Sequence, residues 1–287
     1  MRSHPSEYEL VAPGKLDAVL ELLAKEPGAW MPIAGGTELM VQYGAGRLPA
    51  RKLVSLWGLG ELRQIESTAQ ALIIGAGCTY TDLRNHPLVA QEFPLLARAA
   101  SWTGSIANQN RGTLGGNIVN ASPAADSLPA LMVYEAELLL TSARGTRRMP
   151  YVEFHTGYKQ TKLAADEIIR AIALQPRFSG YYGYSRKVGT RNAQAIAKLC
   201  LAGLGKISGN KIEDVRLAIG SMAVTPVRLR HTEEALLSQP YSTALMSEAR
   251  QAMEAEVAPI DDIRSSALYR LRVAGNLLQE FLEGLFA

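Results

Sequence analysis

Two glycine pairs constrain the fold of this chain more than any other feature of its sequence. Gly35-Gly36 lies between two apolar runs in PIAGGTELMV, and Gly115-Gly116 lies in RGTLGGNIVN. Glycine weakens the interior of a strand, so such a pair marks a tight turn or a place where the backbone approaches another group closely. Each pair is compatible with a simple turn. Each is also compatible with a loop whose bare N–H groups face an anion.

The arrangement of the two pairs suits a dinucleotide better than a single phosphate. They are about 80 residues apart, and a polar residue, Thr37 or Asn117, follows each. Neither pair belongs to a GxGxxG fingerprint or to a GxxxxGK[ST] loop, so the sequence does not support a Rossmann or P-loop site. A pyrophosphate has two phosphates, and glycine loops allow amides to approach both. Asp126 is either an acceptor for a ribose hydroxyl or a carboxylate at a helix N-terminus.

Hydrophobic periodicity predicts an α+β fold in two parts. KLDAVLELLAK has apolar residues at helical spacing, and AELLLTSARGTRRMPYVEF is typical of a hairpin that turns at Arg144-Gly145. We expect a first domain over residues 1–177, with a small αβ part to about residue 60 and a larger part after it. The second domain, 178–287, is predicted to have three antiparallel strands, in YYGYSRKVG, AIAKLCLAGLGKI and KIEDVRLAIGSMA, followed by helices.

Composition excludes several classes of function. The 287 residues carry a formal net charge of only +3, which gives no basic field for nucleic acid. No apolar run reaches the ~18 residues of a membrane span, and MRSHPSEYEL lacks the apolar core of a signal peptide. We therefore expect a cytoplasmic protein with no membrane span.

The reactive side chains are few. Cys78 and Cys200 are the two cysteines, and neither belongs to a metal-ligand motif, whereas an iron–sulfur cluster needs about four thiolates. The four histidines are isolated from one another, and none lies beside a nucleophile motif. We therefore predict no catalytic side chain and no metal site. A nucleotide cradle without acid–base groups indicates that a bound cofactor such as a flavin carries the chemistry.

Four collinear motifs resemble the FAD-binding medium subunit of the molybdenum hydroxylases, the family of xanthine dehydrogenase and carbon monoxide dehydrogenase. The motifs are AGGTEL, RGTLGGNIVNASPAADS, FHTGYKQTKLAADEII and YSRKVGTRNAQAIA, and the resemblance covers nearly the whole chain. It implies an FAD-binding domain of the vanillyl-alcohol-oxidase/PCMH type, followed by the C-terminal α+β domain of the flavoprotein subunit. It also implies two partners, an iron–sulfur small subunit and a molybdenum-cofactor large subunit, assembled as a dimer of heterotrimers. Electrons would pass from the partner's clusters through FAD to NAD or another acceptor.

The resemblance also implies roles for individual residues. The segment that wraps the FAD pyrophosphate matches Ile33, Ala34, Gly35, Gly36, Thr37, Glu38 and Leu39, and the second phosphate loop matches Thr113, Gly116 and Asn117. Asp126 matches the acidic residue that holds ribityl or ribose hydroxyls, and Ile169 matches an apolar residue packed on the isoalloxazine. Lys187 matches a basic residue near the flavin pyrimidine edge. Tyr158 matches an aromatic position near the flavin and the acceptor site.

The chain departs from the family pattern at a few positions, which leaves other functions open. Thr103 stands where the family often has a larger apolar residue that shields the flavin, and Ile106-Ala107 replaces the usual Pro-Gln. The loop after Lys187, TRNAQA, lacks the acidic cluster found near NAD in xanthine dehydrogenases. One alternative is a stand-alone flavin reductase on the same fold, and another is a non-catalytic assembly subunit that has lost FAD.

Overall fold

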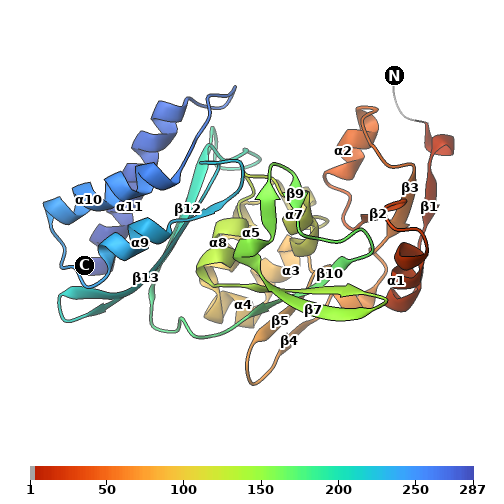
Figure 1. The fold of residues 1–287 in the computed structure, drawn as a ribbon, viewed down its shortest axis with the longest axis horizontal. Coiled ribbons are helices and arrows are strands. Elements are labelled where there is room, and N and C mark those ends of the chain that lie inside the picture. Colours follow the sequence, from red (N-terminus) through yellow and green to blue (C-terminus); the bar gives the residue numbers. More distant parts are fainter. Residues whose placement is uncertain (1–3) are drawn as a thin grey trace.

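The computed structural model describes residues 4–287, which form three sheets with their helices and one small hairpin (Figure 1). The α-helices are α1 (Leu16–Lys25), α2 (Leu39–Gly44), α3 (Tyr80–Asn85), α4 (Pro87–Glu92), α5 (Pro94–Trp102), α6 (Ile106–Gln109), α7 (Leu114–Asn120), α8 (Leu128–Val133), α9 (Arg230–Leu236), α10 (Thr243–Glu256) and α11 (Ala267–Phe286). The strands are β1 (Glu9–Val11), β2 (Trp30–Ile33), β3 (Lys52–Ser55), β4 (Ile65–Ser67), β5 (Leu72–Gly75), β6 (Glu137–Ser142), β7 (Gly145–Pro150), β8 (His155–Gly157), β9 (Gln160–Thr161), β10 (Ile168–Leu174), β11 (Tyr182–Val188), β12 (Leu199–Ser208), β13 (Lys211–Gly220) and β14 (Val227–Arg228). None of these helices is long and apolar enough to cross a membrane.

The N-terminal part is a small parallel sheet of order β1-β3-β2 with the predicted helix α1. The buried residues of α1 are Leu16, Val19, Leu20 and Leu23. They follow the i, i+3, i+4, i+7 pattern of one helix face, and they pack with Trp30 and Val54 of the sheet. The first glycine pair follows β2 and precedes α2. It therefore connects a strand to a helix.

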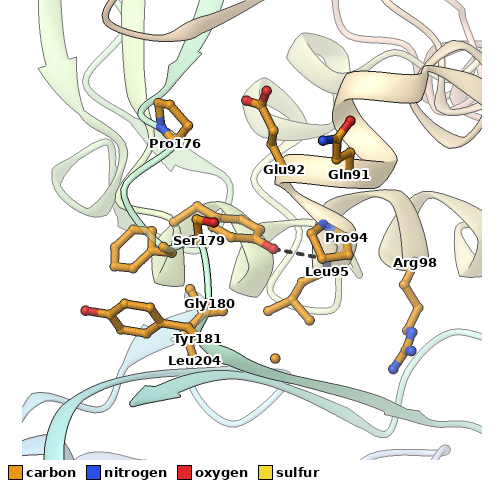
Figure 2. A pocket seen from close by; sticks show the side chains of 13 residues that line it. Gln91, Glu92, Pro94, Leu95, Arg98, Pro176, Ser179, Gly180, Tyr181 and Leu204 are labelled. Carbon is orange, nitrogen blue, oxygen red and sulfur yellow. Dashed lines mark hydrogen bonds between the residues drawn. The ribbon is translucent and has the colours of Figure 1, made fainter. Parts of the chain in front are cut away.

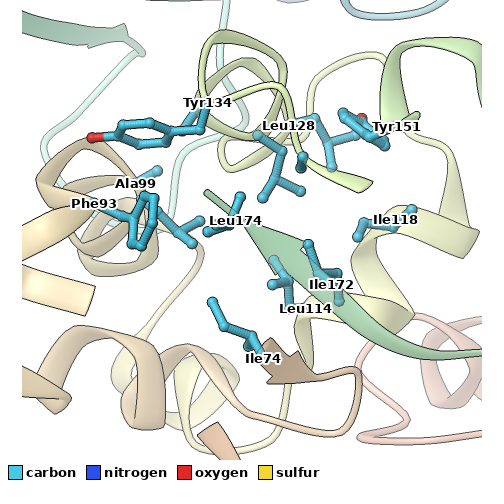
Figure 3. Close-up of a cluster of buried hydrophobic side chains, with 14 of the residues drawn as sticks. Ile74, Phe93, Ala99, Leu114, Ile118, Leu128, Tyr134, Tyr151, Ile172 and Leu174 are labelled. Atoms are coloured by element: carbon cyan, nitrogen blue, oxygen red, sulfur yellow. The ribbon is translucent and has the colours of Figure 1, made fainter. Parts of the chain in front are cut away.

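The middle part is a five-stranded antiparallel sheet of order β4-β5-β10-β6-β7 covered by helices α3 to α8 (Figure 1). The hairpin of β6 and β7 turns at Ala143-Arg144, one residue before the predicted Arg144-Gly145, because Gly145 already pairs with Ser142. Figure 3 shows how side chains from the strands, such as Ile74, Ile172 and Leu174, meet Phe93, which lies between α4 and α5, and Leu128 of α8 in one core. This core fixes the position of α7, the helix that carries the second glycine pair.

The C-terminal part contains the three predicted antiparallel strands, β11, β12 and β13, and a fourth, β14. The prediction of three strands was short by one because β14 has two residues, too few to show an alternating pattern. Residues 199–205 of β12 are all buried because both faces of this sheet are covered. Ala202 and Leu204 join the core of the middle part, whereas Leu199 and Leu201 pack with α11 and its neighbours.

Candidate functional site

The first glycine loop presents a row of unused backbone donors. Within residues 4–287, the N–H groups of Ala34, Gly35, Gly36, Thr37 and Glu38 donate to no protein acceptor. The loop begins where β2 ends, at the same edge of the parallel sheet as the end of β3. Ligands of open α/β sheets commonly bind at this edge, and consecutive free amides form an anion-binding concavity.

The two glycine loops lie against each other, although they are far apart in sequence. A Cβ on Gly35 would lie 1.7 Å from the carbonyl oxygen of Arg111, so only glycine allows this approach. Gly36 has a φ of 75°, a left-handed conformation that glycine adopts without strain. On the other side, a Cβ on Gly116 would lie 3.9 Å from the Cβ of Ala34. The fold therefore brings the two predicted loops into one site.

The second loop differs from the first because its amides already have acceptors. The N–H groups of Leu114 and Gly115 donate to the carbonyls of Cys78 and Ala76, at 3.0 and 2.9 Å. Thr113 caps α7, since its hydroxyl oxygen accepts from the N–H of Gly116 at 3.1 Å. This loop thus offers side chains rather than a row of amides to a ligand. Its glycines serve packing, since a Cβ on Gly115 would lie 2.6 Å from the Cβ of Ala76.

A buried ion pair forms the inner part of the site. Lys187 Nζ on β11 lies 2.6 Å from Asp126 Oδ2 and donates to the carbonyl of Trp102 at 3.0 Å. Both charged side chains are about nine-tenths buried, with 11% and 8% of their surface exposed. Burial raises the pKa of Asp126 to about 6, and the attraction of Lys187 opposes this rise. Asp126 Oδ1 is buried without a hydrogen-bond partner, so it is available to a hydroxyl donor of a ligand.

Short hydrogen bonds connect this ion pair to the second loop. Ser127, next to Asp126, donates to Asn117 Oδ1 at 2.9 Å, and its hydroxyl lies 3.1 Å from that of the buried Tyr80. Asn117 therefore lies between the glycine loops and the ion pair. Asp126 does lie just before the N-terminus of α8, as one interpretation of the sequence expected. Its partner, however, is Lys187 and not the end of the helix.

A third segment borders the outer side of the site. Lys159 Nζ donates to Asn120 at 2.7 Å and lies 3.4 Å from Glu38, so it joins the hairpin of β8 and β9 to both glycine loops. Its neighbour Tyr158 is 64% exposed beside this contact. The sequence motif predicted Tyr158 here but missed the role of the basic residue that follows it.

The remaining predicted residues offer less to a ligand. Thr103 ends α5, directly after the carbonyl that Lys187 binds, and its hydroxyl donates to the carbonyl of Ala99 at 2.9 Å. Ile169 lies at a bulge of β10 and is 4% exposed, so most of its surface already contacts the protein core. Leu39 is the first residue of α2, and Ile33 is the last of β2.

The structure also places four residues in the site that the sequence analysis did not single out: Trp57, Tyr80, Arg111 and Ser127. Arg111 and Ser127 are the first and last residues of RGTLGGNIVNASPAADS, so membership of this motif could have indicated that they lie at the site. Trp57 and Tyr80 lie outside every quoted motif, and nothing local in the sequence links them to the glycine loops.

Other reactive groups lie in structural settings. Both cysteines are buried free thiols, and burial raises the pKa of Cys78 to about 12. His155 Nε2 lies 2.8 Å from the carbonyl of Ile118, and burial lowers its pKa. No group of three or more His, Cys, Asp or Glu residues suited to a metal occurs within residues 4–287.

A cavity of ≈ 300 Å³ lies away from these loops, between α4, α5 and the segment that leads into β11 (Figure 2). Its lining includes Pro94, Arg98 and Tyr181 but none of the predicted site residues. The hydroxyl of Tyr134 accepts from the N–H of Leu95 at 3.2 Å, so this buried polar group is already satisfied. The chemistry of the glycine loops makes them the stronger candidate site.

An open row of amides at the ends of parallel strands, with a buried acceptor further in, defines a protein that binds a dinucleotide cofactor. Comparison with known proteins agrees with this class. Residues 6–176 match the family model of the FAD binding domain in molybdopterin dehydrogenase. Residues 184–285 match that of the CO dehydrogenase flavoprotein C-terminal domain.

Relatives match the chain along most of its length. The putative xanthine dehydrogenase FAD-binding subunit of Escherichia coli K12 is 30% identical over 92% of this chain and 90% of its own length. The glyceraldehyde dehydrogenase medium chain of Sulfolobus acidocaldarius is 29% identical over 94% and 95%. A solved carbon monoxide dehydrogenase chain from Hydrogenophaga pseudoflava superposes with a TM-score of 0.93, at 26% identity and over 98% of both chains.

The chain belongs to the family of FAD-binding medium subunits of the molybdenum hydroxylases, and its cofactor is FAD. It is an oxidoreductase subunit with the expected PCMH-type FAD domain. The residues present fit this cofactor, since the free amides of the first loop suit a pyrophosphate and the unpartnered Asp126 Oδ1 suits a hydroxyl group.

Proposed function

We propose that this chain is the electron-transfer flavoprotein of a three-component molybdenum hydroxylase. It would receive electrons from iron–sulfur clusters of a small partner chain and pass them to NAD or another acceptor. The organic substrate would be oxidised at the molybdenum cofactor of a large partner chain. The observation that carries this proposal is the row of five free amides, in a site whose second loop also connects through Asn117 and Ser127 to the unpartnered oxygen of Asp126.

FAD supplies the redox chemistry, and the residues of this chain bind and orient it. In this proposal the segment from Ile33 to Leu39 holds the pyrophosphate through its amides, since bare N–H groups suit a doubly charged anion. Thr113, Gly116 and Asn117 form the facing wall. Asp126 accepts a hydrogen bond from a ribityl or ribose hydroxyl.

The remaining residues act around the flavin ring. Lys187 would stabilise negative charge near the pyrimidine edge, because one of its three N–H groups has no acceptor within residues 4–287. Ile169 and Thr103 would contact the ring or lie behind it, and Tyr158 would lie on the side of the acceptor. A structure of the chain with FAD bound would test each of these roles.

Exposed apolar residues around the glycine loops support the docking of a partner chain. Met40 and Val41 on α2, Val119 on α7 and Tyr158 are 42–64% exposed, and the contacts of Lys159 join their segments. Apolar residues gathered beside a functional site often mark a protein interface. The two buried cysteines of this chain cannot supply the four thiolates of a cluster, so the electrons would have to come from a docked partner.

The division into domains and the cellular location are part of the same proposal. We place the domain boundary at residue 177, five residues before β11, and the boundary of the small N-terminal part near residue 60. The N-terminal part has a hydrophobic cluster of its own, and so has the outer face of the C-terminal sheet, whereas Ala202 and Leu204 pack with the middle part across the boundary. The cytoplasmic location stays a prediction, and fractionation of cells that produce the chain would test it.

The cofactor content of the purified chain is the first test. We expect a flavin absorption spectrum and the release of FAD rather than FMN on denaturation, at about one FAD per chain. A colourless chain that takes up no added FAD would favour the assembly-subunit alternative. Release of FMN alone would contradict a site built for a pyrophosphate.

Purification from the native source tests the partners. We expect two other chains to co-purify, with molybdenum and iron in the complex, and a native mass that fits a dimer of heterotrimers. Reduction of the FAD by substrate and its reoxidation by NAD would identify NAD as the acceptor. If the FAD-loaded chain alone turned over NADH and an organic acceptor rapidly, the stand-alone reductase would be the better reading.

A further inference from the structure

One arginine at the first glycine loop has no anionic partner among the described residues. The guanidinium carbon of Arg111 lies 3.8 Å from the centre of the Trp57 ring, and its Nε lies 3.5 Å from the carbonyl oxygen of Gly35. No other hydrogen bond or ion pair of this side chain occurs within residues 4–287. The four N–H groups on its two terminal nitrogens are therefore free, although the side chain is held in place.

The position of Trp57 follows from the sheet. Strands β2 and β3 are parallel neighbours, so the chain leaves both at the same edge: β2 leads into Ala34 and β3 leads toward Trp57. The N–H of Trp57 donates to Ser55 at 3.3 Å, which keeps the indole close to the end of β3. A guanidinium stacks favourably on an indole face, and the contact restricts an otherwise flexible side chain.

The charges around the loop leave one cation unbalanced. Glu38 lies at the far end of the loop, but Lys159 lies 3.4 Å from it and neutralises it. Arg111 then remains as the cation beside five free amides. The five amides donate hydrogen bonds but carry no net charge, so a cation is needed to balance the two negative charges of a pyrophosphate.

We propose that Arg111 is the cation that binds the cofactor pyrophosphate, and that Trp57 is a positioning residue that stacks on Arg111 and aims it at the first loop. This inference rests on the proposed function, since it assigns residues to the same FAD site. It predicts that the affinity for FAD depends on ionic strength through a single side chain. A guanidinium suits this role because it donates through two parallel N–H groups to phosphate oxygens.

The test uses the full chain freed of cofactor and titrated with FAD by fluorescence at several salt concentrations. We expect Arg111→Gln to weaken FAD binding about 10- to 100-fold, the range for a hydrogen bond to a charged group. Its binding should also depend less on salt than that of the wild type. Arg111→Lys should lie between the two, because it keeps the charge and loses the bidentate geometry.

Arg63→Gln is the matched control, because Arg63 also lies over the Trp57 ring, at 4.8 Å, but has Asp82 as an ionic partner. Its FAD affinity and salt dependence should equal those of the wild type. Trp57→Leu should weaken FAD binding in the wild type and have little further effect when combined with Arg111→Gln.

The outcomes separate the two proposals. If the wild-type chain takes up no FAD, the proposed function fails with this inference. If the wild type binds FAD and Arg111→Gln binds equally well with the same salt dependence, only the role of Arg111 is refuted. The role of Arg111 would also be refuted if Arg111→Gln and Arg63→Gln lost FAD affinity equally and both unfolded at lower temperatures. Both arginines would then have a structural role around Trp57.

Discussion

Replacing Lys187 by methionine should lower the reduction potential of the bound FAD. Two of the three N–H groups of Lys187 are used, by Asp126 at 2.6 Å and by the carbonyl of Trp102 at 3.0 Å. One donor is left for the cofactor, so the variant loses one charge-assisted hydrogen bond to the reduced, negatively charged ring. Such a bond contributes about 1.5–3 kcal/mol. At about 30 mV per 1.4 kcal/mol for a two-electron couple, the potential should fall by roughly 30–65 mV.

The ion pair makes this shift depend on pH. Burial already raises the pKa of Asp126 to about 6 while Lys187 opposes the rise, so the loss of Lys187 raises this pKa further. At the acidic end of the range, Asp126 in the variant takes up a proton, and the site keeps the net charge of the original pair. At higher pH, Asp126 ionises without a partner, and its negative charge lowers the potential further. The difference between variant and wild type should therefore grow as the pH rises.

Redox titration of the FAD-loaded chain from pH 6 to pH 9 measures this difference. The matched set is the wild type, Lys187→Met, Asp126→Asn and the double variant. In the Asp126→Asn background the effect of Lys187→Met should not vary with pH, because the titrating carboxyl is absent. An unchanged potential in Lys187→Met with FAD fully bound would refute the reasoning. So would a shift that stays constant over this pH range when Asp126 is present.

Three further predictions concern the loops and the buried carboxylate. The pKa of Asp126 is about 6 without a ligand, and a hydroxyl donor from FAD would lower it, so FAD affinity should fall as pH falls below 6. Titrations at pH 5–8 check this, and an equal fall in Asp126→Asn would contradict it. Gly35→Ala should lower the free energy of unfolding by about 1–3 kcal/mol or more, even without FAD, because the added Cβ would clash with the carbonyl oxygen of Arg111. Gly44→Ala is the control, since nothing lies within 4 Å of its added Cβ; chemical denaturation compares the two, and equal stability would refute the assigned contact. Lys159→Met should speed FAD release several-fold, because Lys159 joins three segments of the site, and stopped-flow dissociation would show no change if it is only a surface residue.

Glycine variants are poor tests of phosphate binding at either loop, because they also disturb the structure of the protein. A β-branched residue at Gly116 would disturb the cap of α7, because its Cβ would lie 2.8 Å from the Thr113 hydroxyl oxygen. Loss of FAD binding in that variant would therefore not show that a phosphate lies there. Gly36 is equally unsuited, since its φ of 75° strains any other residue. The charge variants of Arg111 are better probes because they leave the backbone unchanged.

The sequence by itself determined the features that depend on neighbours along the chain. The spacing of Leu16, Val19 and Leu20 predicted α1, and the turn expected at Arg144-Gly145 predicted the β6–β7 hairpin, which turns one residue earlier. The seven apolar and small residues of 199–205 predicted a strand, and in the structure they are buried on both faces. The glycine pairs and the motif around Asp126 were sufficient to suggest a dinucleotide cofactor. Each signal lies within a short window, where the periods of helix and strand are visible.

Tertiary structure decided which groups of the site are free and which are already used. The sequence suggested two equivalent glycine loops, but the amides of Leu114 and Gly115 have acceptors from the segment around β5, whereas those of the first loop have none. It placed Lys187 near the cofactor without showing that Asp126, 61 residues away, is its partner. It contained no sign that Trp57 holds Arg111. Such contacts join segments that only the packing of sheets and helices brings together, and a single sequence has no local periodicity that reports them.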